Sequence, residues 1–231
     1  MDDGDLGIVS VTVDDVKEGL NTTVCAVVVD PILDCPVGFP FNVSLELHYN
    51  GDPENKVLVF AECDQAKCVD IPIPDDKSVE QQNFTLNAAL KGNTTKLSLL
   101  KNEITTRVQE NDKAFVGFEQ TEYFSSEGGG MLIIWVTVKL NNSDVYKCPV
   151  GYDFEVDVTT HRISAIPGED FKHIEDKLLI PACSTRVPLN ISIINDTIDE
   201  PEEMFGLSVD VQGKDGICIQ QGTANITITD S

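Results

Sequence analysis

Positive charge is scarce in this chain of 231 residues: 16 Lys and Arg stand against 39 Asp and Glu, for a formal net charge of −23 at pH 7. Binding to nucleic acid or to an anionic membrane surface requires clustered basic side chains. We therefore expect no nucleic-acid partner. The carboxylate excess is typical of a cation-binding or a strongly solvated extracellular protein, and solubility alone would explain part of it.

Long apolar runs are also missing, and none approaches the roughly 18 residues that a membrane-spanning helix needs. The polar start "MDDGDLG" does not have the pattern of a signal peptide, so we expect the sequence to be a piece of a longer protein. No window shows a helical apolar stripe with caps, which argues against an α-helical fold.

Histidine is rare, with three in the chain, and the features of a catalytic site are absent from the sequence. There is no Ser/His/Asp arrangement, no Gly-rich phosphate loop and no zinc-type spacing of cysteines. Carboxylates are abundant, but they cluster as metal ligands do. We expect a protein that is not an enzyme.

Two features that are present indicate the compartment. The chain has seven cysteines, and it has eight Asn-x-Ser/Thr sequons, which are possible glycosylation sites. Together they predict an extracellular protein, either secreted or the ectodomain of a membrane protein. The sequons begin at Asn21, Asn42, Asn83, Asn93, Asn141, Asn190, Asn195 and Asn225.

The chain contains an internal repeat. The segment "CPVGFPFNVSLELH" (35–48) matches "CPVGYDFEVDVTTH" (148–161) without a gap, and "FAEC" (60–63) matches "IPAC" (180–183). His48 and His161 fall on the same repeat position, so we interpret them as scaffold residues. The repeat predicts two domains, residues 1–112 and 113–231.

Each copy reads as short strands rich in Val, Ile and Thr, separated by turn residues such as "GGG" and "IPGED". About seven strands in about 110 residues are typical of an antiparallel β-sandwich. We predict an all-β fold of two tandem immunoglobulin-like antiparallel β-sandwiches. In the second copy the expected strands are 116–124, 131–140, 152–161, 175–180, 187–194, 203–212 and 222–229.

If successive strands run in opposite directions, alternate loops share one end of the sandwich. Glu127, Asp170, the stretch 195–203 and Asp230 then lie at one end of the second copy. Carboxylates gathered in this way repel one another and raise each other's pKa. A hard divalent cation such as Ca²⁺ removes that cost. The alternative is an acidic rim whose side chains point into water.

The same topology pairs the cysteines. Cys148 and Cys183 both fall at the opposite end, and their repeat counterparts are Cys35 and Cys63. We predict the disulfides Cys35–Cys63 and Cys148–Cys183.

A third bridge is predicted on the strands of the first copy. Cys25 and Cys68 are both present there, and bulky or aliphatic residues near Trp135 and Val187 replace both in the second copy. Because both cysteines are present in one copy and both are absent from the other, we predict that they form the disulfide Cys25–Cys68. Cys218 is left over and is expected to be a buried free thiol, with an intermolecular bridge as the alternative.

The segments "VGFEQTEYFSSEGGG", "GEDF", "INDTIDEPEEMF" and "ANITITD" resemble the pattern of Calx-beta domains. The first copy matches less completely, through "VKEG", "PDDKSVEQQNF" and "VQEND", and it has no Gly-x-Asp-aromatic. Calx-beta domains are immunoglobulin-like sandwiches, and those that bind Ca²⁺ do so at the end described above. They occur in sodium–calcium exchangers, basement-membrane proteins, adhesion receptors and sponge aggregation factors.

The resemblance implies two ligand sets. In the second copy they are Glu127, Asp170, Asn195, Asp196, the carbonyl of Ile198, Glu200, Glu203 and Asp230. In the first copy they are Glu18, Asp75, Asp76, Glu80, Glu110 and Asp112. Asn195 stands where the family has an aspartate and also begins a sequon, so a glycan there would compete with an ion.

The function expected from these features is a calcium-binding module of a large extracellular adhesion or matrix protein or of a receptor ectodomain. Ca²⁺ would rigidify the array of domains. The expected partners are neighbouring repeats of the same chain and an extracellular protein or glycan, with the fragment itself monomeric. The alternatives are a regulatory Ca²⁺ sensor, as in the exchangers, and a structural spacer without a functional ion.

Overall fold

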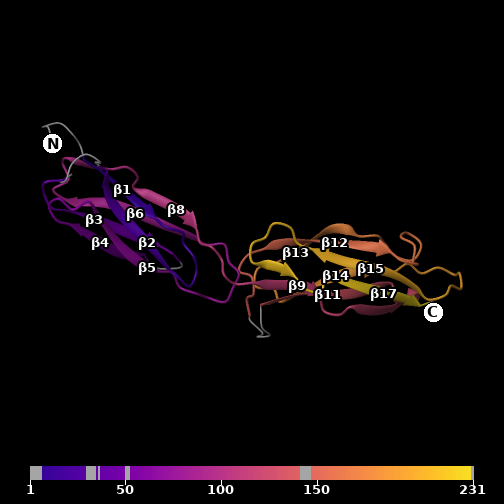
Figure 1. The fold of residues 1–231 in the computed structure, drawn as a ribbon. Coiled ribbons are helices and arrows are strands. Elements are labelled where there is room, and N and C mark those ends of the chain that lie inside the picture. Colours follow the sequence, from indigo (N-terminus) through magenta and orange to yellow (C-terminus); the bar gives the residue numbers. More distant parts are fainter. Residues whose placement is uncertain (1–6, 30–34, 36, 50–52, 141–146, 230–231) are drawn as a thin grey trace. The chain divides into compact units, whose positions relative to one another are not determined.

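The computed structural model describes residues 7–29, 35, 37–49, 53–140 and 147–229. The chain divides into two compact units, one formed by residues 1–76 and 81–111 and the other by residues 77–80 and 112–231. Among the described residues, no helix is long and apolar enough to cross a membrane. The predicted all-β fold of two tandem β-sandwiches is confirmed, and Figure 1 shows it as two groups of strands.

The first unit contains two four-stranded sheets, with the strand orders β5-β2-β1-β7 and β4-β3-β6-β8. Neighbours are antiparallel except for β1 and β7, which are parallel. The strands are β1 (Gly7–Val13), β2 (Asn21–Val29), β3 (Phe41–His48), β4 (Glu54–Phe60), β5 (Ala66–Pro72), β6 (Asn83–Gly92), β7 (Leu97–Leu99) and β8 (Glu103–Arg107).

The second unit repeats this topology, with the orders β14-β11-β9-β16 and β10-β17-β15-β12-β13. Its elements are β9 (Ala114–Phe118), β10 (Glu122–Ser126), the 3-10 turn η1 (Glu127–Gly129), β11 (Met131–Leu140), β12 (Phe154–Arg162), β13 (Glu175–Ile180), β14 (Arg186–Ser192), β15 (Glu203–Asp210), β16 (Ile217–Ile219) and β17 (Thr223–Thr229).

The described residues form eight strands in the first copy and nine in the second, where about seven were expected in each. The expected strand 116–124 is in fact two strands that belong to different sheets. After β9 the chain leaves β11 and crosses over, and β10 then pairs with β17 in parallel. The short strands β7 and β16, each of three residues, account for the rest.

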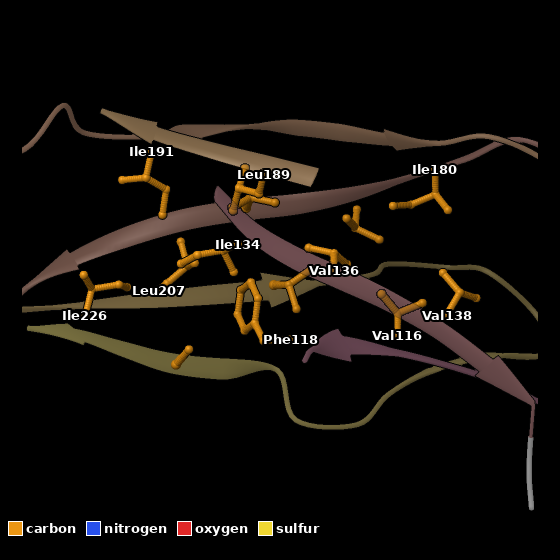
Figure 2. Packing of buried hydrophobic residues seen from close by; sticks show 14 of the residues in the cluster. Val116, Phe118, Ile134, Val136, Val138, Ile180, Leu189, Ile191, Leu207 and Ile226 are labelled. Atoms are coloured by element: carbon orange, nitrogen blue, oxygen red, sulfur yellow. The ribbon is translucent and has the colours of Figure 1, made fainter. Parts of the chain in front are cut away.

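Alternation along the strands builds the two cores. In β11 and β12 every second residue is buried, as the period of two in a strand requires. Ile134, Val136 and Val138 of β11 face Leu207 and Ile226 across the second sandwich (Figure 2). Burial of each such side chain stabilises the fold by about 1.5–3 kcal/mol.

One glycine is required by packing. A Cβ atom on Gly117 would lie 1.7 Å from the backbone oxygen of Gln220, so the chain beside β16 approaches β9 too closely for any side chain. This close approach allows Gln220 to donate a backbone hydrogen bond to Val116. We infer that Gly117 fixes the packing of the short parallel strand against β9.

All three predicted disulfides are present in the structure. Cys25 and Cys68 lie directly opposite each other on β2 and β5, and the bond joins their outward-facing side chains. Cys35–Cys63 in the first copy and Cys148–Cys183 in the second form equivalent bridges.

The second copy replaces the strand disulfide with an aromatic contact. Trp135 lies opposite Pro188, the residue next to Val187. The guanidinium of Arg186 lies 3.6 Å from the centroid of the Trp135 ring, a cation–π contact that covers the same place on the sheet. Cys218 is a free thiol on β16 and is half-buried, where the sequence predicted a buried one.

Candidate metal centre

The first carboxylate of the candidate centre is placed by a tight turn. Ser126 is extended, with φ −93° and ψ 154°, and Glu127 then begins η1 directly after β10. Gly130 has φ +66° and donates a backbone hydrogen bond to the carbonyl of Glu127. Because glycine adopts this conformation at low cost, the "EGGG" sequence turns the chain within four residues. Glu127 is left 5% exposed.

Asp170 is the second buried carboxylate, also 5% exposed. Its Oδ2 accepts a hydrogen bond from the backbone N–H of Ile166, and its carbonyl accepts one from Ile194 at 2.8 Å. The second bond ties the loop after β12 to the start of the segment that follows β14. Two segments far apart in sequence are therefore held at one place.

Two aromatic rings lie at the base of these loops. Phe171, the last residue of "GEDF", stacks on Phe205, the last residue of "INDTIDEPEEMF", with ring centroids 4.0 Å apart and planes 10° from parallel. Both side chains are fully buried. The aromatic positions of the motif therefore position the carboxylates beside them by packing.

Glu200 completes a group of three carboxylates. One oxygen from each of Glu127, Asp170 and Glu200 can be chosen so that all three lie within 4.8 Å of one another. These three carboxylates come from the loops after β10, β12 and β14. Alternate loops were predicted to share one end of the sandwich, and the structure places residues of these three loops side by side.

Glu203 lies against the same group. A hydrogen bond with Asp170 is the main reason that the pKa of Glu203 is raised to about 7, and burial and the charges of Asp170, Glu200 and Glu127 add to it. Burial is the first cause of the raised pKa of Glu200, followed by the charges of neighbouring carboxylates. Every charged group that shifts these two pKa values is itself a carboxylate.

The remaining candidates of the second copy are placed differently. Asp196 contributes to the negative field at Glu200, and its Oδ1 accepts a hydrogen bond at 2.7 Å from the N–H of Ile198. Asn195 and Ile198 are exposed on the loop between β14 and β15. Asp230 lies outside the described residues.

In the first copy the structure brings together two of the candidate carboxylates, Glu18 and Glu110, which share a side-chain hydrogen bond. Glu18 is buried, and its Oε1 accepts a hydrogen bond from the N–H of Asp76 at 2.9 Å. Burial is the main cause that raises the pKa of Glu18 to about 7. A hydrogen bond with Glu110 and the charges of Glu110 and Asp76 add to it, and the bond from Asp76 opposes it.

The other candidates of the first copy are not part of this pair. Asp75 accepts a hydrogen bond from Nδ2 of Asn111 at 2.8 Å, and Asn111 also donates to the carbonyl of Glu18. Glu80 and Asp112 belong to residues 77–80 and 112–231, which form the second unit, so neither is placed with the other candidates. Asn111 was missed at the sequence level, although it lies within the "VQEND" match.

These donors fit a hard divalent cation. Both groups consist of carboxylate oxygens from separate segments, and such oxygens are the ligands that Ca²⁺ prefers. Burial and a hydrogen bond to another carboxyl group are the main causes that raise the pKa values of Glu18 and Glu203, and repulsion by neighbouring carboxylates adds to both. A bound cation would remove that repulsion.

Most of the chain matches one domain family. A family model described as the Calx-beta domain matches residues 48–108 and 109–231. Among solved structures, the apo form of the Calx CBD1 domain is 21% identical, with 52% of this chain and 98% of that chain covered and a TM-score of 0.44. CBD12 from CALX1.2 is 12% identical, with 90% and 92% covered and a TM-score of 0.41. The calcium binding domain CBD12 of CALX1.1 is 12% identical, with 95% and 96% covered and a TM-score of 0.39. Curated protein sequences give no significant match.

Proposed function

The chain belongs to the Calx-beta domain family, and on that premise we propose that it is a tandem calcium-binding module of a large extracellular adhesion or matrix protein or of a receptor ectodomain. The observation that carries this proposal is the group of Glu127, Asp170 and Glu200, in which two buried carboxylates and a third lie within 4.8 Å of one another.

The second copy holds the better ligand set. Glu127, Asp170 and Glu200 would contact Ca²⁺ directly, and Glu203 and Asp196 stand close enough to add oxygens or charge. Ca²⁺ takes six to eight oxygen ligands in a flexible shell. The ion supplies positive charge that neutralises the carboxylates and cross-links three loops. A cation at this place favours the ionised form of Glu203, whose pKa is about 7, so binding should release protons near neutral pH.

Three disulfides support an extracellular site of action, because such bonds are rare in cytosolic proteins. They disfavour a cytosolic regulatory sensor. Extracellular Ca²⁺ is abundant, and modules of this kind bind with Kd values on the order of 10⁻⁴–10⁻³ M. A site with that affinity stays filled and acts as a structural cross-link.

The proposed role is to stiffen the protein and to bind partners, without catalysis. Ca²⁺ would hold the loops of each domain in one conformation, and the partners would be neighbouring repeats and an extracellular protein or glycan. The charge of −23 disfavours nucleic acid as a partner. We propose that the fragment alone is monomeric.

Calcium titration of EDTA-treated protein by calorimetry tests this function. We expect saturable binding and a rise in melting temperature. At a Ca²⁺ concentration of 100 times Kd the gain is about 2.7 kcal/mol. Glu127→Gln should remove binding to the second copy, whereas Glu175→Gln, which alters an exposed carboxylate on β13, should leave it intact. Absence of binding up to several millimolar Ca²⁺ would leave only the structural spacer.

A further inference from the structure

Five of the eight sequons begin on strands, and each follows the period of two in a strand. The asparagine and the Ser or Thr two residues later face outward, and the residue between them is buried in the sandwich. The five asparagines are Asn21, Asn42, Asn83, Asn190 and Asn225.

On β14, both polar positions of one sequon lie opposite exposed apolar side chains. Asn190 is the direct partner of Ile133, and Ser192 is the direct partner of Met131. The middle residue, Ile191, is fully buried. The outer surface at this place is therefore a patch of large apolar side chains with a sequon beside it.

The first copy has the same arrangement on β3 and β4. Asn42 lies opposite Val59, and Ser44 lies opposite Val57. Val43 between them is fully buried. This patch is on the other type of sheet and in the other copy, so it is an independent instance.

A third instance is on β10 and β17. Thr227 of the sequon at Asn225 lies opposite Phe124, and Asn225 itself pairs with Glu122. The five apolar residues Ile133, Met131, Val59, Val57 and Phe124 each expose between 52% and 69% of their surface.

Each patch also lies at the edge of a sheet. The strands β4, β10 and β14 are terminal in the strand orders of their sheets. An exposed apolar edge promotes pairing with another chain, and proteins usually protect it with charge, proline or a covering segment. Val57, Val59 and Phe124 lie on such edge strands, and Met131 and Ile133 lie on the strand beside one.

Another sequon provides a comparison within the same chain. Asn83 on β6 lies opposite Arg107, and Thr85 of the same sequon lies within 3.1 Å of Thr105, hydroxyl to hydroxyl. Its surroundings are polar although its strand geometry is the same. A glycan at Asn83 has no apolar patch to cover.

We propose that N-linked glycans on Asn42, Asn190 and Asn225 cover these three apolar patches and block association through the adjacent sheet edges. A residue directly opposite an asparagine has its Cβ atom only about 4.5–5.5 Å away. The first sugar on Asn42 or Asn190 therefore emerges beside Val59 or Ile133. Phe124 lies opposite Thr227, two residues along β17 from Asn225 and on the same face, within reach of a whole glycan. N-glycans are bulky and solubilising. The inference rests on the extracellular location in the proposed function.

The modification requires a glycan donor and a transferase of the secretory pathway. The donor is an oligosaccharide joined to a lipid through diphosphate. A bond forms between Nδ2 of the asparagine and the anomeric carbon of the first N-acetylglucosamine, and the bond from that carbon to the phosphate oxygen breaks. The lipid diphosphate leaves with the bonding electrons, and one amide proton passes to a base.

The test uses the whole chain secreted from a mammalian cell line. Glycopeptide mass spectrometry gives the occupancy at each sequon. The triple variant Asn42→Gln, Asn190→Gln, Asn225→Gln is compared with wild type and with Asn83→Gln by retention on a hydrophobic-interaction column and by fluorescence of an apolar-site dye. We expect occupied sites, and longer retention with stronger fluorescence for the triple variant but not for Asn83→Gln.

Two further samples guard against misfolding of the triple variant. Folded wild type trimmed by an endoglycosidase to single N-acetylglucosamine residues should show a shift in the same direction. Adding Phe124→Ser to the Asn225→Gln variant should reverse the increase in retention and fluorescence that Asn225→Gln causes. Both results would assign the shift to the exposed patches.

The inference is overturned if the secreted protein carries no sugars at Asn42, Asn190 and Asn225. It is also overturned if Asn83→Gln shifts column retention and dye fluorescence by one third of the shift in the triple variant, which is the share of a single site. The calcium titration separates this outcome from the proposed function. Protein that binds no Ca²⁺ but carries covering glycans overturns the calcium proposal and supports this one.

Discussion

Replacing Asp170 by asparagine should change stability in opposite directions with and without Ca²⁺. The substitution keeps the shape of the side chain and an oxygen that can accept from Ile166, and it removes one negative charge. In the ion-free protein that charge faces Glu127 and Glu200, so its removal should stabilise the fold. In the presence of Ca²⁺ the same charge attracts the ion, so its removal should weaken binding.

The magnitude follows from the separation of the carboxylates. At 4.8 Å and an effective dielectric constant of about 20, two unit charges repel by about 3.5 kcal/mol. Solvent and partial protonation, seen in the pKa of Glu203 near 7, reduce this to an expected gain of about 1–2 kcal/mol. Such a gain corresponds to a melting temperature higher by about 4–8 °C in EDTA. Loss of one charged ligand should raise the Kd for Ca²⁺ at least tenfold, or by about 1.4 kcal/mol.

Thermal denaturation in EDTA and in saturating Ca²⁺, together with calorimetric titration, measures both effects. Asp199→Asn is the matched control, because it removes an exposed carboxylate from the same loop as Glu200. We expect it to leave the Kd nearly unchanged. The reasoning is refuted if Asp170→Asn lowers the melting temperature in EDTA, or if it binds Ca²⁺ as tightly as wild type.

Three further predictions concern pH, packing and the disulfides. The pKa values of Glu18 and Glu203 are raised from 4.5 to about 7, so their protonated forms stabilise the ion-free fold fully below about pH 4.5 and this contribution is lost as pH rises through 7. The melting temperature in EDTA should fall across that range, and Ca²⁺ should oppose the fall. Phe205→Ala removes a fully buried ring and should lower the free energy of unfolding by about 3–5 kcal/mol; urea denaturation measures this, and a loss below 1 kcal/mol would contradict the role of the stack. Replacing Cys148 and Cys183 by serine opens a loop of 35 residues and should cost about 4 kcal/mol, measured by thermal denaturation.

Strand parity was sufficient to predict the overall arrangement of the site. A period of two fixes which residues face the core, and antiparallel succession fixes which loops meet. These rules brought Glu127, Asp170 and Glu200 to one end and paired the cysteines. They depend on the order of the strands and are insensitive to errors of a few residues at strand ends.

Details decided by contacts between sheets were not predictable. The break between β9 and β10 occurs because the chain passes from one sheet to the other, and no local pattern in residues 119–121 shows which sheet each half will join. The burial of Glu127 depends on loops that come from distant parts of the sequence. The sequence located the counterparts of Cys25 and Cys68 only as near Trp135 and Val187, and the register of β14 places Pro188 opposite Trp135.

The parallel pairing of β10 with β17 has a mechanical consequence. β10 is close to the start of the second domain and β17 is close to its end, and five consecutive residue pairs join them, from Glu122 with Asn225 to Ser126 with Thr229. Tension applied to the two ends of the domain would pull these strands in opposite directions along their length. The load would then act as shear on all five pairs at the same time, so the pairs would not separate one after another. At the equivalent place in the first domain the described residues form a single bridge, between Lys17 and Gln109.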